Sequence, residues 1–172
     1  MRIETERLIL RPFFKNDLCD FHEYCTQPDV GIRAGWCAHK SREESEQLLT
    51  KWINSKGRLA IVLKKENKVI GHITILKDTS GHEDTREIGF VLNHSYWRQG
   101  FMKEAVLSLI DFLFRHWGLK YIWACCFETN TASRSLLESC GFLLMQTGSF
   151  DFKPINQTLR TYEYRISFQD VK

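Results

Sequence analysis

The segment that most constrains the fold runs from residue 87 to residue 116. It begins with six residues rich in β-branched and aromatic side chains, which predict a strand, and it ends with apolar residues at helical spacing. Gly100 lies between them, where the missing Cβ lets the backbone approach a ligand closely. The first N–H groups of a helix lack partners within the helix, and the helix macrodipole adds positive charge there. Because Arg98 and Lys103 lie beside these donors, we expect this loop to bind a pyrophosphate.

The rest of the chain alternates between other strand-like and helix-like segments. Strands are predicted over residues 6–14, 58–63, 69–76, 121–127, 143–150 and 159–168, and helices over residues 17–26 and 41–54, with a short helix after Asn130. Ser41 and Glu44 have the spacing of a capping box, and Gly141 suits the left-handed position after a helix. Residues 28–40 are predicted to be irregular, residues 64–68 to form a hairpin turn, and residues 77–85 to form a loop.

Four blocks of this sequence resemble the GCN5-related N-acetyltransferases (GNAT), in particular the RimJ/RimL type that acetylates ribosomal-protein N-termini. The blocks are Thr5-Glu6-Arg7-Leu8-x-Leu10-Arg11-Pro12, Val69-Ile70-Gly71-x-Ile73, the segment from Glu87 to Ala105, and Asn130-x-x-Ser133-x-x-Leu136-Leu137-Glu138-x-x-Gly141-Phe142. In the family's loop motif, Gln/Arg-x-x-Gly-x-Gly/Ala, the marked positions are Trp97, Gly100 and Met102, so only the central glycine matches. The resemblance implies an α/β (α+β) fold with a mixed, mostly antiparallel seven-stranded sheet, helices on both faces, and a splay between strands four and five.

The resemblance also implies a site for acetyl-CoA and assigns its residues. The pyrophosphate is expected at the loop, and the pantetheine arm is expected to pair with backbone groups of the central strand, one of which would also face the thioester oxygen. Asn130 and Ser133 are expected to contact the same arm. The cofactor-binding set is thus Phe90, Val91, Leu92, Arg98, Gln99, Gly100, Phe101, Met102, Lys103, Asn130 and Ser133. Asn130 has a second interpretation as a helix cap.

Glu87 is the candidate general base, acting directly or through a water molecule. An α-amine has a pKa of about 8, so roughly one molecule in ten is already neutral near pH 7. An N-terminal acceptor therefore needs little base catalysis. The alternative is that Glu87 is a structural carboxylate paired with an arginine. His72 and His22 are weaker candidates, because a buried or solvated structural histidine is the more common explanation for each of them.

No general acid can be assigned with the same clarity. Many relatives place a tyrosine seven residues after the asparagine, where this chain has Leu137. In the RimJ/RimL type, a serine at the position of Ser133 lies near the thiol, and Ser133 takes that catalytic role by resemblance. Because a thiol has a pKa of about 8.5, a thiolate leaves without an obligatory proton donor. The absence of the tyrosine is therefore compatible with an active enzyme.

Composition sets the remaining limits. A chain of 172 residues with 43% hydrophobic and 26% charged residues is expected to form one domain, here a single N-acetyltransferase domain over residues 1–172. The net charge of +3 is spread along the chain and does not indicate a nucleic-acid partner. The six cysteines lack metal-site spacing, so we expect buried, reduced thiols and no metal. Without an apolar run of membrane length or a signal peptide, a cytoplasmic location with no membrane partner is expected.

The resemblance thus implies an acyltransferase that moves an acetyl group from acetyl-CoA to a primary amine in a ternary complex. No cysteine has a convincing nucleophile setting, so direct attack is favoured over a covalent intermediate. By resemblance, the preferred acceptor is a protein or peptide N-terminal α-amine, and homodimers occur among similar proteins. Two alternatives stay open: a small-molecule amine such as an antibiotic or polyamine, and a non-catalytic acyl-CoA-binding module. Tyr24, Trp36 and Trp52 either line an acceptor pocket or, as aromatic residues more often do, belong to the core.

Overall fold

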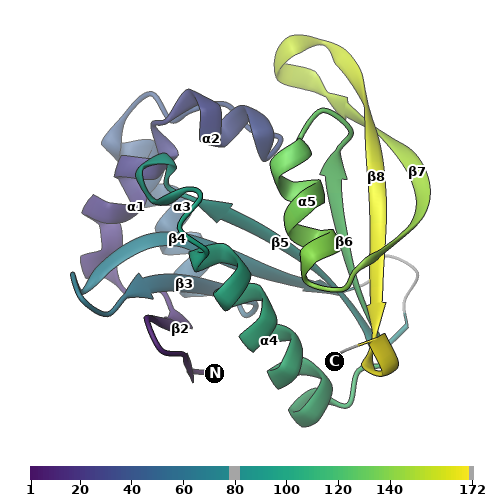
Figure 1. Cartoon of the computed structure of the whole chain (residues 1–172). Coiled ribbons are helices and arrows are strands. Elements are labelled where there is room, and N and C mark those ends of the chain that lie inside the picture. Colours follow the sequence, from purple (N-terminus) through teal and green to yellow (C-terminus); the bar gives the residue numbers. More distant parts are fainter. Residues whose placement is uncertain (78–81, 171–172) are drawn as a thin grey trace. The chain divides into compact units, whose positions relative to one another are not determined.

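The structure is a computed structural model that describes residues 1–77 and 82–170. Part of the loop predicted over residues 77–85 lies outside the described residues. The chain forms two compact units, Met1–Thr74 with Phe90–Ala105 and Ile75–Gly89 with Val106–Lys172. The strands β4 (Lys68–Lys77) and β5 (Thr85–Leu92) and the helix α4 (Phe101–Trp117) each continue from one unit into the other (Figure 1).

The first unit contains an antiparallel run of strands in the order β1-β2-β3-β4. Its strands are β1 (Ile3–Glu4), β2 (Leu8–Pro12), β3 (Arg58–Leu63) and the first part of β4. The end of β5 lies beside β4, because the N–H of Asn93 donates to the carbonyl of Ile70 at 2.8 Å. The predicted hairpin over β3 and β4 is confirmed, with Asn67 at a positive φ of 49° in its turn.

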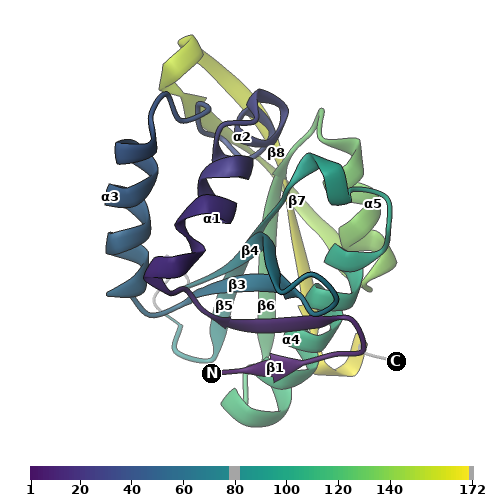
Figure 2. The ribbon, with the colours of Figure 1, turned by 90° about the vertical axis from the view of Figure 1, so that its left-hand side faces the viewer.

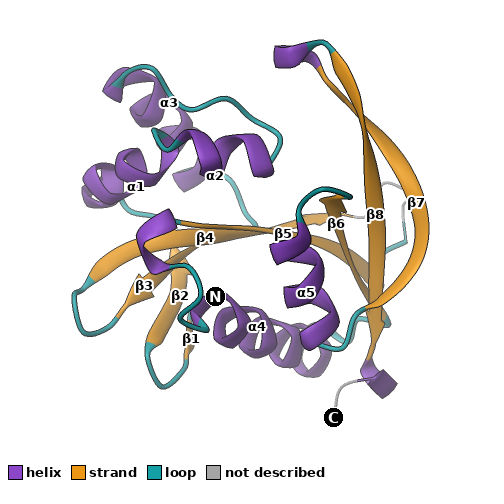
Figure 3. Ribbon diagram, turned by 45° about the horizontal axis from the view of Figure 1, so that its top comes forward, coloured by secondary structure: helices purple, strands orange, loops and turns teal. Residues whose placement is uncertain are grey.

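Three helices gather on one face of these strands (Figure 3): α1 (Leu18–Cys25), α2 (Pro28–Arg33) and α3 (Arg42–Ile53). Figure 2 shows α1 and α3 side by side. The helices bury an apolar core against the strands, including Phe13, Phe21, Tyr24, Leu49 and Val62. The Ser41 hydroxyl accepts from the N–H of Glu44 at 3.2 Å, so the predicted cap of α3 is confirmed.

The second unit contains the order β5-β6-β8-β7. The start of β5 pairs in parallel with β6 (Tyr121–Phe127), while β8 (Gln157–Ser167) lies antiparallel between β6 and the edge strand β7 (Leu143–Phe152). The helix α5 (Thr131–Ser139) contacts β6 (Figure 1). Gly141 follows α5 at a φ of 91°, which confirms the predicted left-handed position.

Three predictions about the elements were wrong in detail. The described residues hold eight strands instead of seven, because Ile3–Glu4 pairs with β2 as an additional short strand, β1. The strand predicted over residues 6–14 covers only Leu8–Pro12, since the backbone turns at Thr5, whose N–H donates to the carbonyl of Leu8. Residues 28–40 are not irregular throughout, since α2 begins at Pro28, where the fixed φ of proline suits a helix start. The α/β class with mostly antiparallel pairing is confirmed.

Candidate active site

The loop between β5 and α4 has the backbone that its glycine predicts. A short 3₁₀ turn, His94–Tyr96, follows β5, and α4 begins at Phe101. Arg98 has a φ of 59° and Gly100 a φ of 79°, both in the left-handed region. Such a φ costs a residue with a Cβ about 1–2 kcal/mol, so a glycine at position 100 has a physical reason. The N–H groups of residues 101–103 open α4 and have no acceptor within the helix.

Buried hydrogen bonds fix the start of this loop. Asn93 is fully buried; its amide donates to Glu23 at 2.8 Å and its oxygen accepts from Gln27 at 3.0 Å and from the N–H of Ser95 at 3.0 Å. The indole N–H of Trp97 donates to the carbonyl of Leu92 at 2.7 Å. These bonds tie the start of the loop to β5 and α1.

The end of β5, where backbone pairing with pantetheine is predicted, packs closely on β4. A Cβ on Gly71 would lie 2.2 Å from the carbonyl oxygen of Val91, a distance that real Cβ atoms do not reach. Gly71 therefore allows the two backbones to approach. Val91 is buried, whereas Phe90 and Leu92 are partly exposed. The carbonyl of Leu92 already accepts a hydrogen bond from the indole N–H of Trp97.

Two residues outside the predicted set also meet at this loop. The guanidinium of Arg7 donates to the carbonyl of Gln99 at 3.0 Å and to the carboxylate of Glu104 at 2.6 Å. Burial disfavours the charged form of Glu104, but hydrogen bonds from Thr5 and Arg7 outweigh it and hold the pKa of Glu104 below its usual value. Both residues belong to the blocks of the resemblance, but only a contact across 97 positions reveals the pair.

Glu87, Asn130 and Ser133 belong to the second unit. Glu87 lies opposite Trp123 in the parallel pairing of β5 with β6, and this ladder ends at Ile88 and Ala124, next to the predicted splay. Burial raises the pKa of the Cys125 thiol, and the charges of Glu87 and Glu163 add to that rise. Glu87 is therefore close enough to Cys125 for its charge to act there.

Asn130 caps α5, as the second interpretation of this residue requires. Its side-chain oxygen accepts from the N–H of Ser133 at 3.3 Å, and the residue is buried. Leu137 on the same helix is fully buried, so the position of the family's tyrosine is a core position here. The helix thus brings Asn130 and Ser133 together but presents no acid at position 137.

The histidines and aromatic residues of the first unit have structural surroundings. Burial, with the nearby charge of Arg58, lowers the pKa of His72 to about 3, so this imidazole is neutral near pH 7. His22 shares a hydrogen bond of 2.8 Å with the buried hydroxyl of Ser45. Tyr24 is fully buried, and Trp36 and Trp52 pack against the same core. The interpretation of Tyr24 as a core residue is confirmed, while Trp36 and Trp52 are partly buried.

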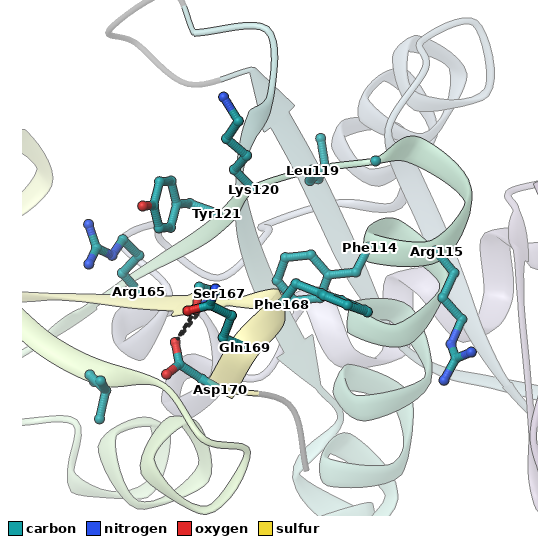
Figure 4. A pocket seen from close by; sticks show the side chains of 12 residues that line it. Phe114, Arg115, Leu119, Lys120, Tyr121, Arg165, Ser167, Phe168, Gln169 and Asp170 are labelled. Atoms are coloured by element: carbon teal, nitrogen blue, oxygen red, sulfur yellow. Dashed lines mark hydrogen bonds between the residues drawn. The ribbon is translucent and has the colours of Figure 1, made fainter.

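A separate pocket of about 740 Å³ lies in the second unit, where α4 ends and β6 begins. Figure 4 shows Phe114 and Phe168 in it, packed edge to face with ring centroids 5.9 Å apart, and Arg165, whose guanidinium lies over the ring of Tyr121. None of the predicted site residues lines it. Over the described residues, no helix is long and apolar enough to cross a membrane, and no three potential ligands gather as a metal site.

A family model described as an acetyltransferase (GNAT) domain matches residues 7–143, most of the chain. The chain belongs to the GNAT acetyltransferase family. A crystal structure of a GNAT-family acetyltransferase from Bacillus anthracis is 30% identical, covers 97% of this chain and 98% of its own, and has a TM-score of 0.87. The predicted fold and the acyltransferase activity are thereby confirmed, and acetyl-CoA is the acetyl donor that the family uses.

Two more distant structures show the same fold with different names. Ribosomal-protein-S5-alanine acetyltransferase from Vibrio fischeri has a TM-score of 0.77 at 22% identity, covering 100% of this GNAT chain and 99% of its own. Spermidine N-acetyltransferase from Vibrio cholerae, solved with CoA and spermine, has a TM-score of 0.80 at 18% identity, covering 96% and 98%. At these identities the likeness concerns the fold and leaves the acceptor open.

Proposed function

We propose that this GNAT protein is a RimJ/RimL-type enzyme that moves the acetyl group of acetyl-CoA to the α-amine of a protein or peptide N-terminus. The observation that carries the cofactor part is the loop that opens α4, with Gly100 in the left-handed region and Arg98 and Lys103 beside the free helical N–H groups. Backbone donors, the helix dipole and two cations all favour the pyrophosphate of acetyl-CoA. The four sequence blocks support the choice of acceptor.

The proposed reaction is a direct attack. The neutral amine forms a bond to the thioester carbon, the carbon–sulfur bond breaks, and CoA leaves as a thiolate while the amine loses a proton. A backbone N–H of Phe90, Val91 or Leu92 stabilises the oxyanion of the tetrahedral intermediate. Glu87 accepts the proton of the amine, directly or through water. Ser133 is the candidate that assists the departing thiolate, which needs little help at its pKa of about 8.5.

The surroundings of Cys125 favour direct attack over an acetylated cysteine. Cys125 is exposed at the surface, but the partial burial of its thiol and the charges of Glu87 and Glu163 raise the pKa of this thiol, so it stays protonated near neutral pH. Because the thiolate is the nucleophilic form, Cys125 is a poor acceptor of the acetyl group. The raised pKa of the Cys125 thiol therefore supports direct transfer in a ternary complex.

The test is thiol release from acetyl-CoA with panels of N-terminal peptides, polyamines and aminoglycosides, using the natural chain, Glu87→Gln and Glu83→Gln. Glu83 is an exposed carboxylate four residues away that pairs with Lys77, so it serves as a matched control. We expect peptides to stimulate release and Glu83→Gln to match the natural chain. Glu87→Gln is expected to lower kcat about tenfold near pH 7 with CoA binding intact, because roughly one α-amine in ten is neutral without a base.

Each other outcome contradicts a specific part of the proposal. Stimulation by polyamines or aminoglycosides alone overturns the α-amine acceptor. Unchanged turnover in Glu87→Gln assigns Glu87 a structural role. Tight acetyl-CoA binding without release by any acceptor favours a binding module, and absence of acetyl-CoA binding overturns the proposal as a whole.

A further inference from the structure

Arg7 lies in the turn before β2 but makes its contacts at the start of α4. Its Nη1 donates to the carbonyl of Gln99 at 3.0 Å, its Nε to Glu104 at 2.6 Å, and its guanidinium lies over the ring of Phe101, 4.5 Å from the centroid. A planar guanidinium suits such a site because it donates in several fixed directions and stacks on a ring at the same time.

The bond to Gln99 orients a specific backbone donor. In a planar trans peptide the carbonyl and the following N–H point in opposite directions. Because the carbonyl of Gln99 points to Arg7, the N–H of Gly100 points away from it. A glycine at a φ of 79° tolerates either orientation of this peptide, so an external contact has to select one. Arg7 supplies that contact.

The hydrogen bond from Arg7 to Glu104 offsets the negative charge of this carboxylate at the start of α4. A carboxylate in the first turn of α4 opposes the binding of an anion there. Glu104 accepts from the side chain of Thr5, from the N–H of Arg7 at 2.9 Å, and from the guanidinium of Arg7. Arg7 thus balances the one acidic side chain in this turn and leaves the charges of Arg98 and Lys103 for the ligand.

We propose that Arg7 is a positioning residue for the acyl-CoA pyrophosphate: it orients the Gly100 N–H and neutralises Glu104 at the start of α4. This inference rests on the proposed function, since it assigns a role in binding the same cofactor. Arg7 acts through the loop, so it changes the affinity for acetyl-CoA and leaves the acyl-transfer step alone.

The experiment compares Arg7→Gln and Arg7→Lys with Arg115→Gln. Arg115 is the matched control, because it pairs with Asp111 at 2.5 Å on the exposed side of α4, at its other end. Thermal unfolding of each variant first identifies a temperature at which all of them are folded. At that temperature we measure Kd for CoA by calorimetry, and kcat and KM for acetyl-CoA by steady-state kinetics. We expect Arg7→Gln to raise Kd and KM about tenfold with kcat within about twofold, Arg7→Lys to recover part of the loss, and Arg115→Gln to change neither.

A second variant separates positioning from general stability. Adding Glu104→Gln to Arg7→Gln removes the unbalanced carboxylate, so we expect it to recover about threefold of the lost affinity. A purely structural role predicts further weakening instead. The inference is overturned if Arg7→Gln lowers only the unfolding temperature and binds CoA like the natural chain. If the natural chain itself does not bind CoA, the proposed function fails, and that result is distinct from failure of this inference.

Discussion

The hydroxyl of Tyr24 and the Nδ1 atom of His72 lie 3.1 Å apart and share a hydrogen bond in the core of the first unit. Both side chains are buried, and Trp52 packs edge to face on the imidazole with ring centroids 4.6 Å apart. A buried polar group without a partner keeps its full desolvation cost. The pair therefore joins α1 to β4 only as long as both partners are present.

Replacing Tyr24 with phenylalanine is expected to lower the free energy of unfolding by about 1–3 kcal/mol, because the imidazole of His72 loses its partner. Tyr96→Phe is the control, since the Tyr96 hydroxyl bonds the exposed carboxylate of Glu66. Urea unfolding of both variants checks this expectation. Equal losses in the two variants would contradict it.

Stability is expected to fall as the pH is lowered below about 6.5. His72 has a folded pKa of about 3 and an unfolded value near 6.5, so the unfolded state binds the proton first. The free energy of unfolding is therefore unaffected by the titration of His72 above pH 6.5. Between pH 6.5 and pH 3 it falls by up to about 1.4 kcal/mol per pH unit. Urea unfolding from pH 7 to pH 4 measures the slope, which His72→Gln is expected to flatten and the exposed-site control His82→Gln to leave unchanged.

Gly71→Ala is expected to destabilise the protein by about 3 kcal/mol, because its Cβ would meet the carbonyl oxygen of Val91 and force β4 from β5. At Gly118 a Cβ would meet no atom of the described residues within 4 Å, so Gly118→Ala costs only about 1–2 kcal/mol for its positive φ. Chemical unfolding compares the two. A smaller loss for Gly71→Ala would show that the strands can separate cheaply.

Gly100→Ala is expected to match Gly118→Ala in stability but not in cofactor binding. Both glycines have a positive φ, 79° and 63°, so both alanines carry similar strain. Only the loop of Gly100 faces the proposed pyrophosphate site, so only Gly100→Ala raises KM for acetyl-CoA, by about tenfold. Steady-state kinetics and unfolding are measured on the same preparations. A KM equal to that of Gly118→Ala would remove Gly100 from the binding loop.

Glu87→Gln is expected to speed alkylation of Cys125 about twofold at pH 8, because the loss of a negative charge lowers the pKa of the thiol. Mass spectrometry of peptides after timed exposure to iodoacetamide measures the rate. The rate at Cys19, an exposed thiol, serves as the internal reference. An unchanged ratio of the two rates would mean that Glu87 does not act on Cys125.

The sequence by itself determined the elements that depend on near neighbours. Apolar periodicity marked β5 and α4, the hydroxyl of Ser41 marked the start of α3, and Gly141 marked the end of α5. These features are local, since a helix or a turn satisfies its backbone within a few residues. The same local blocks carried the resemblance to the GNAT family.

Tertiary structure alone decided the contacts between distant residues. It buried Leu137, joined His72 to Tyr24, and brought Arg7 to Glu104 across 97 positions. No periodicity records such contacts, because they depend on which faces pack together and not on the spacing along the chain. The charge and orientation of the loop at Gly100 follow from that packing, so the loop motif is local while the geometry that makes it a binding site is not.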